Sequence, residues 1–218
     1  MGGLSQEQAS SREKTLFSAF ALSLPGPLVT GFAAASSRSA TQLADFIRRA
    51  TELLALGVSW WVFRKLNRGA TPSEDERARL ERLANRSVAA AMCCSGVAML
   101  IVAVSRLAVA RPSGNVSLGL TIAVLGLITN GWFWRRYAAM TRETFNAVIE
   151  SQRKLYLAKT SVDLCVVAAL TAVAVAPTHP ATRYIDVAGS GTVALYLLYS
   201  GLRSAKSASS DDVTSRPM

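Results

Sequence analysis

The sequence predicts an all-α membrane protein, a bundle of six helices that each cross the bilayer. Half of the 218 residues are hydrophobic, although the formal net charge is +10. The charged residues gather between long apolar runs, as in membrane proteins, where cationic loops set the orientation. A soluble protein this basic would indicate nucleic-acid binding. The placement of the charge argues against that class, and we expect the lipid bilayer as the partner.

Six segments approach the roughly 20 mostly apolar residues that a membrane-spanning helix needs. A Pro25-Gly26-Pro27 run predicts a kink in the first of them. In the sixth, Gly189 and Gly191 predict close contact with a neighbouring helix. The predicted spans are residues 15–35, 40–65, 87–109, 116–137, 155–177 and 184–205, which together make a transmembrane domain of residues 15–205.

The segments outside the spans predict the orientation. Residues 1–14 form a predicted N-terminal segment, residues 66–86 and 138–154 two linkers, and residues 206–218 a disordered tail. Most Lys and Arg residues lie in or beside these segments. The loops on the other side hold only Arg38, Arg106, Arg111 and Arg183. By the positive-inside rule this asymmetry predicts a multi-pass protein of the cell (cytoplasmic) membrane with both termini in the cytoplasm.

Charged side chains inside two predicted spans carry the most information. The second span holds four of them at positions i, i+3, i+4 and i+7, which is one face of a helix: Asp45, Arg48, Arg49 and Glu52. The fifth span holds two, one turn apart, with two polar residues extending the same stripe toward the cytoplasm: Lys159 and Asp163, with Gln152 and Tyr156. Each such charge costs about 2.5–3.5 kcal/mol at the bilayer centre on insertion scales, so its presence needs a reason.

Two interpretations of these charges remain open. They form ion pairs that lock helix packing, a site for a substrate or a proton, or both at once. At a rise of about 1.5 Å per residue, Glu52 and Asp163 fall near one depth on antiparallel helices, so one shared cluster is expected. The ion pairs expected under the first interpretation are Arg48–Glu52, Arg49–Asp45 and Lys159–Asp163.

Several stretches resemble the cation diffusion facilitator (cation efflux) family. Residues 32–61, FAAASSRSATQLADFIRRATELLALGVSWW, are similar to the region of its first and second helices. Residues 127–137 are similar to the end of its fourth helix, residues 155–172 to its fifth and residues 184–203 to its sixth. The resemblance implies that family's six-helix transmembrane domain and a homodimer. We expect no counterpart of the family's C-terminal cytoplasmic domain.

The resemblance also implies where a metal would be carried. The family holds a transported divalent metal between helices two and five, each giving two ligands four residues apart. Those positions fall on Arg48, Glu52, Lys159 and Asp163 of this sequence. Arginine and protonated lysine have no lone pair to offer, and two fixed cations repel a divalent ion. The metal site is therefore degenerate, and zinc is not the expected substrate. His179, in an outer turn, is not an expected ligand.

Three functions follow from these residues. The preferred one is secondary, proton-coupled transport of an unknown non-zinc small molecule or ion. The first alternative is a non-transporting scaffold or partner subunit. The second is an intramembrane enzyme that uses the Arg/Glu/Lys/Asp cluster for acid–base chemistry on a lipophilic substrate. No nucleophile motif favours an enzyme, and no catalytic, cofactor-binding or metal-binding residue is predicted. The predicted substrate or proton site comprises Asp45, Arg48, Arg49, Glu52, Tyr156, Lys159 and Asp163.

Overall fold

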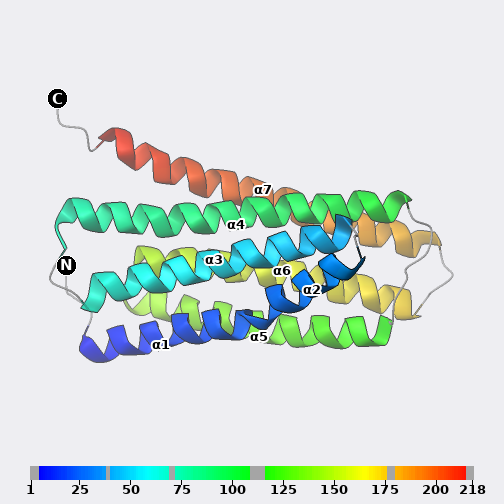
Figure 1. Ribbon diagram of the computed structural model, residues 1–218, viewed down its shortest axis with the longest axis horizontal. Helices are drawn as coiled ribbons and strands as arrows, with labels where there is room; N and C mark the ends of the chain where they lie inside the picture. The colour runs from blue at the N-terminus through cyan, green and yellow to red at the C-terminus, as the bar shows by residue number, and fades with distance from the viewer. Residues whose placement is uncertain (1–4, 38–39, 69–71, 109–115, 176–179, 215–218) are drawn as a thin grey trace.

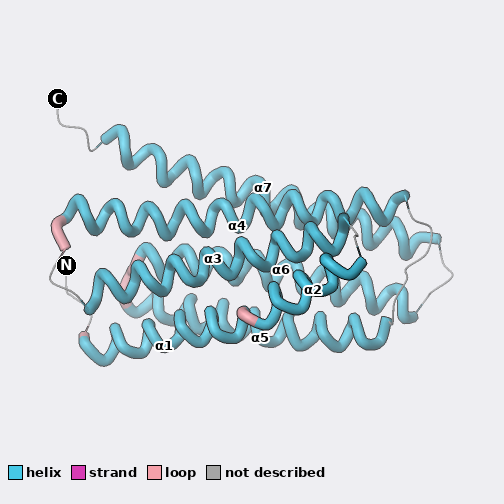
Figure 2. The backbone as a smooth tube through the Cα atoms, viewed as in Figure 1, coloured by secondary structure: helices cyan, strands magenta, loops and turns pink. Residues whose placement is uncertain are grey.

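The computed structural model describes residues 5–37, 40–68, 72–108, 116–175 and 180–214. Within these ranges the chain is helical and contains no strand, and the helices align along one axis (Figure 1; Figure 2). The fold is thus the all-α membrane bundle that the sequence predicts. The helices are α1 (Gln6–Ser23), α2 (Pro25–Ser37), α3 (Ala40–Arg68), α4 (Glu74–Ala108), α5 (Val116–Glu143), α6 (Ala147–Val175) and α7 (Pro180–Thr214).

The first predicted span consists of two helices. Helix α1 ends at Ser23 and α2 begins at Pro25. Proline lacks the N–H that a helix interior needs but suits the first position of a new helix. The predicted kink at Pro25-Gly26-Pro27 is therefore confirmed. Helices α1 and α2 form one broken rod, so that the seven described helices make six rods (Figure 2).

Helices α4 and α7 are longer than their predicted spans, at 35 residues each. Helix α4 begins at Glu74, inside the predicted linker. There the Glu76 main-chain N–H donates to the Ser73 hydroxyl at 3.2 Å, and three acidic residues occupy the first turn. Both features stabilise a helix N-terminus. Helix α7 continues to Thr214, into the segment for which we predict a disordered tail.

Length and composition together mark three parts of the described chain as able to cross a membrane, Gln6–Phe32, Glu74–Ser105 and Ala147–Ala172. Helix α3 is long enough, at 29 residues, but its charged residues lower its hydropathy. Helices α2 and α3 both begin far from the beginning of α1 (Figure 1). The first residues of α1 and the last of α7 lie at one end of the bundle, where α3 also ends and α4 begins (Figure 1).

The surface of the bundle is more apolar than that of a soluble protein, and a few polar side chains are buried inside. Large apolar side chains point outward, among them Phe32, which is 78% exposed, and Leu54, which is 67% exposed. Glu52 and Gln152 are instead buried, at 6% and 0% exposure. An apolar outer surface with polar groups turned inward is what a lipid solvent requires, because unsatisfied polar groups are costly there.

Two buried apolar clusters surround the polar interior. The first joins α1, α3, α4, α5 and α6 and includes Leu16, Phe63 and Tyr137. The second joins α3, α4, α6 and α7 and includes Met92 and Leu197. Helix α6 contributes to both clusters, and its polar residues contact α3 on one side and α5 on the other.

Two adjacent residues of α1 bind to the ends of two other helices. The buried guanidinium of Arg12 donates to the main-chain carbonyls of Met140 at 2.7 Å and Thr144 at 3.1 Å, at the end of α5. The next residue, Glu13, accepts from Arg68 Nε at 2.7 Å, at the end of α3. The last carbonyls of a helix lack partners within the helix. Arg12 satisfies two such groups and ties α1 to the bundle.

Helices α4 and α7 approach each other closely at small residues. A Cβ added at Gly201 would lie 2.6 Å from Cys93 Sγ, and one added at Gly96 would lie 2.7 Å from Leu198 Cγ. Glycine at these positions lets the two backbones come close. Gly189 and Gly191 show no such contact among the described residues, because a Cβ at either would meet no heavy atom of them within 4 Å, and the close contact predicted there stays a prediction.

Candidate functional site

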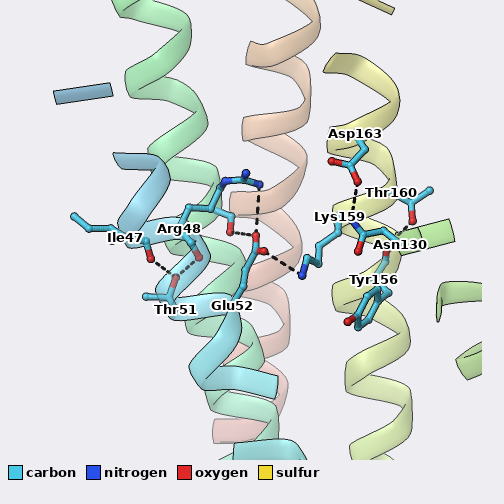
Figure 3. Close-up of polar contacts among 10 residues, drawn as sticks. Ile47, Arg48, Thr51, Glu52, Asn130, Tyr156, Lys159, Thr160 and Asp163 are labelled. Carbon is cyan, nitrogen blue, oxygen red and sulfur yellow. Dashed lines mark hydrogen bonds and ion pairs between the residues drawn. The ribbon is translucent and has the colours of Figure 1, made fainter. Parts of the chain in front are cut away.

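The charged faces of α3 and α6 meet through one interhelical ion pair. Lys159 Nζ of α6 lies 3.2 Å from Glu52 Oε2 of α3, and the two side chains are only 12% and 8% exposed (Figure 3). The helices run in opposite directions along the bundle (Figure 1). Each carries its polar stripe at the same level, so the predicted shared cluster includes this pair.

The second oxygen of Glu52 contacts two further side chains. Ser95 of α4 donates its hydroxyl to Glu52 Oε1 at 3.0 Å. Arg48, one turn earlier on α3, places its guanidinium 3.6 Å from the same oxygen. Glu52 therefore contacts polar side chains of α3, α4 and α6, and its single negative charge lies between two cations. Charge-assisted contacts of this kind are strong when water is excluded.

Asp163, one turn after Lys159 on α6, faces a different helix. Asn130 of α5 donates its amide to Asp163 Oδ2 at 2.6 Å (Figure 3). Gly126, one turn earlier on α5, lies close to the same carboxylate, since a Cβ there would be 3.3 Å from Oδ2. Helix α5 thus supplies both a hydrogen-bond donor and the space that the carboxylate occupies.

An aromatic ring also contacts the Lys159 side chain. Lys159 Nζ lies 5.0 Å from the centre of the buried Tyr156 ring, which is within the range of a cation–π interaction. The Tyr156 ring packs against Phe133 and Tyr137 of α5 at centroid distances of 5.1 and 5.4 Å. The ammonium group is therefore held by a carboxylate on one side and a ring face on the other.

Polar contacts between α3 and α6 continue two turns farther. Gln152 Nε2 of α6 donates to Ser59 Oγ of α3 at 2.7 Å, and both residues are completely buried. The side-chain carbonyl of Gln152 is buried without a hydrogen-bond partner among the described residues. A buried acceptor in this condition generally indicates a water molecule or another donor nearby.

The structure brings most of the predicted site residues together, with a different pairing. The predicted Arg48–Glu52 contact is present. The described ion pair of Lys159 is with Glu52, whereas Asp163 is hydrogen-bonded by Asn130. Lys159 reaches across the interface to the buried carboxylate of Glu52. The Asn130 amide, and not Lys159, is the described partner of Asp163.

Of the other predicted site residues, one lies apart from the Lys159–Glu52 pair, and one has a side chain that lies outside the described residues. Arg49 lies against α2, where its guanidinium would be 3.4 Å from a Cβ at Gly26. The side chain of Asp45 lies outside the described residues, and so does the predicted Asp45–Arg49 contact. His179 is outside them as well.

Sequence reasoning missed two partners, Ser95 and Asn130. An amide in the middle of the apolar run of residues 116–137 was a usable signal, because a polar group inside a span needs a partner. Ser95 offered little signal, since serine is common in helices that pack closely in membranes.

The donor set at this site does not fit a divalent metal. The four positions that the resemblance implies hold two cations, and Lys159 lies directly on the one carboxylate that faces α6. Among the residues that the structure describes, no group of three or more His, Cys, Asp and Glu side chains could hold a metal ion. Since zinc prefers about four such ligands, this site would bind it poorly.

The broken first rod, the inward-facing charges and the α3–α6 pair define an α-helical membrane protein of the transporter type. Comparison with protein families matches residues 16–211 to the cation efflux transmembrane domain. The chain belongs to this family, as the resemblance in its second, fifth and sixth predicted spans indicated. No curated protein sequence shows significant similarity to the chain.

Proposed function

We propose that this cation-efflux-type protein is a proton-coupled secondary transporter of a substrate other than zinc. The observation that carries the proposal is the Lys159–Glu52 ion pair, 3.2 Å long and buried between α3 and α6. By the family resemblance these two positions face the transported metal. Here the ammonium of Lys159 provides the positive charge instead. Buried charges in membrane helices are expensive and generally mark transport pathways or proton relays.

The arrangement suggests how a proton would act on this pair. A proton taken up by Glu52 removes its negative charge, so the attraction that holds Lys159 to α3 is lost. Lys159 then has Asp163 within reach on its own helix, since residues four apart are neighbours on a helix surface. Loss of the proton from Glu52 restores the original pair. Each proton therefore makes or breaks the ionic link between α3 and α6.

Two further features support a route for the proton and a place for the substrate. The Gln152–Ser59 contact continues the polar seam toward the end of α3, and its unpartnered carbonyl oxygen can accept from water. On the other side of Glu52, Arg48 and Arg49 carry five N–H donors each. Guanidinium groups suit an anionic or zwitterionic substrate group better than a metal ion.

We propose the orientation with both termini in the cytoplasm of the cell. The first residues of α1 and the last of α7 lie at the same end of the bundle (Figure 1), and Arg64, Lys65 and Arg68 lie at that end of α3. Reporter fusions after residues 68 and 205 should both read as cytoplasmic. A fusion within residues 109–115 should read as external. A reversed pattern would contradict the orientation.

The transport proposal can be tested in proteoliposomes that contain a pH-sensitive dye. Monovalent cations, zinc, amino acids and small organic anions are added in turn outside. We expect at least one non-zinc compound to drive proton movement, zinc to drive none, and Lys159→Met to abolish the signal. The matched control is Lys154→Met, which removes an exposed cation from the same helix. Zinc-driven proton flux by the unaltered protein would contradict the proposal.

A non-transporting scaffold is the second candidate, favoured by the complete pairing of Glu52. Both of its oxygens already have protein partners, Lys159 on one and Ser95 with Arg48 on the other. In a scaffold these contacts would only hold three helices together. Lys159→Met would then lower the amount of folded protein, while neither it nor the unaltered protein would move protons with any compound.

A further inference from the structure

Two shallow pockets adjoin each other at the C-terminal end of α3. The first, of about 240 Å³, lies between α1 and α3 and is lined in part by Lys14, Phe17 and Trp60. The second, of about 310 Å³, is lined by Trp61 and Lys65. Arg64 and Arg68 line both pockets. Cations from two helices therefore surround one continuous surface.

The charge of this surface favours an anion. Four cations line the pockets, and the carboxylates that neutralise them are Glu13, 2.7 Å from Arg68 and 3.9 Å from Arg64, and Glu76, 2.7 Å from Lys65. A guanidinium carries five N–H donors, so these contacts leave donor capacity on both arginines. The side chains of Arg64 and Arg68 are 49% and 59% exposed and can reach a ligand from outside.

The surface is also aromatic, which separates it from a simple basic patch. Arg64 lies 5.6 Å above the Trp60 ring and Lys65 lies 5.8 Å from the Trp61 ring. Trp61 and Phe17 are 48% and 49% exposed. Tryptophan concentrates at membrane–water interfaces, where one part of it contacts acyl chains and the other contacts headgroups. The site therefore offers cations for a headgroup beside apolar rings for the adjoining chain.

We propose that the C-terminal end of α3 binds the phosphate group of an anionic phospholipid, held by Arg64, Lys65 and Arg68. Basic pockets between helices at the headgroup level are where such lipids bind. The planar fork of arginine matches two phosphate oxygens at once. Because the first pocket lies between α1 and α3, a bound headgroup would also strengthen the attachment of α1. This inference is independent of any transported substrate.

The test uses the purified full chain in detergent, with thermal unfolding followed as phosphatidylglycerol or phosphatidylcholine is added. Phosphatidylglycerol should raise Tm and phosphatidylcholine should not. Arg64→Gln should weaken the apparent affinity for phosphatidylglycerol about fivefold, the effect of roughly one interfacial charge. Arg64 is the variant of choice because its contact with Glu13 is long and Arg68 keeps its own. The control is Arg86→Gln, an exposed arginine of α4 outside both pockets.

Each outcome decides the proposal. Equal losses in Arg64→Gln and Arg86→Gln would show that only overall charge matters and would overturn it. A Tm rise with inorganic phosphate alone, abolished by Arg64→Gln, would assign the pocket to free phosphate and overturn the lipid assignment. If Arg64→Gln does not fold, Lys65→Gln replaces it, and lipid retention is then counted by native mass spectrometry. Unchanged retention in Lys65→Gln would also contradict the proposal.

Discussion

Lys159 and Glu52 are joined across two helices by a contact of 3.2 Å, although an acid on the same helix as the lysine lies only one turn away. The choice of partner has a physical reason. Glu52 is buried at 6% exposure, whereas Asp163 is only partly buried and accepts from the amide of Asn130 at 2.6 Å. The cation therefore contacts the more buried of the two carboxylates, and this links α3 to α6.

Removal of Lys159 alone should be far more harmful than removal of the pair. Lys159→Met leaves Glu52 buried with Arg48 as its remaining described cation, and breaking a buried pair costs about 3–5 kcal/mol. In Glu52→Gln/Lys159→Met no unpaired charge is left in this contact, so much of the stability should return. Thermal unfolding in detergent of both single variants and the double variant gives the coupling energy. Additive effects would mean that the two side chains do not interact.

Asn130→Leu should destabilise the protein by about 1.5–3 kcal/mol, the range for a hydrogen bond to a charged group. The substitution keeps the side chain of similar size but removes the only described donor to Asp163. Thr129→Leu, at the exposed neighbouring position, is the control and should change little. Urea or heat unfolding followed by tryptophan fluorescence measures both. Equal stability of the two variants would show that Asp163 does not depend on Asn130.

Arg12→Met should release α1 from the end of α5. The variant loses two hydrogen bonds to the carbonyls of Met140 and Thr144, and leaves these buried acceptors to find water. We expect a loss of about 2 kcal/mol or more and faster proteolysis within residues 1–23. The control is Lys14→Met, an exposed cation two residues later. If Arg12→Met is cleaved no faster than that control, the guanidinium does not hold α1 in place.

Gly201→Ala should separate α4 from α7. The added methyl would lie 2.6 Å from Cys93 Sγ and 3.1 Å from the Ala89 carbonyl oxygen, so the Cys93 side chain or one of the two backbones has to shift. Overpacking of this kind costs about 1–3 kcal/mol. Gly191→Ala on the same helix meets nothing described within 4 Å and should be neutral or slightly stabilising, because alanine favours helix. The Tm difference between these two variants tests whether the close approach exists.

The fold was predictable because the sequence features that indicate it are local. Long apolar runs and the proline pair at Pro25 and Pro27 are local features, and they predicted the helices and the break between α1 and α2. The separation of the predicted first span into α1 and α2 needed no information on packing. The start of α4 at Glu74 is also a local feature, because a serine followed by three acidic residues favours a helix N-terminus.

The charged residues of the candidate site and the Arg48–Glu52 contact within α3 were predictable, but the contacts between helices were not. The i, i+4 spacing on each helix identified Arg48, Glu52, Lys159 and Asp163, because such spacing is visible in the sequence. Which carboxylate the lysine contacts depends on the rotation of α6 and on what α5 offers to Asp163. That information lies in the packing of three helices, and no local pattern encodes it.

A cation that belongs to the polypeptide cannot be chelated, diluted or exchanged. The charge of Lys159 is part of the polypeptide itself, so the positive charge beside Glu52 does not depend on the supply of a metal ion in the surroundings. A metal-dependent relative would respond to scarcity or excess of its ion at this point. This protein should keep the same internal balance in either condition, and a strong chelator should leave its unfolding temperature unchanged.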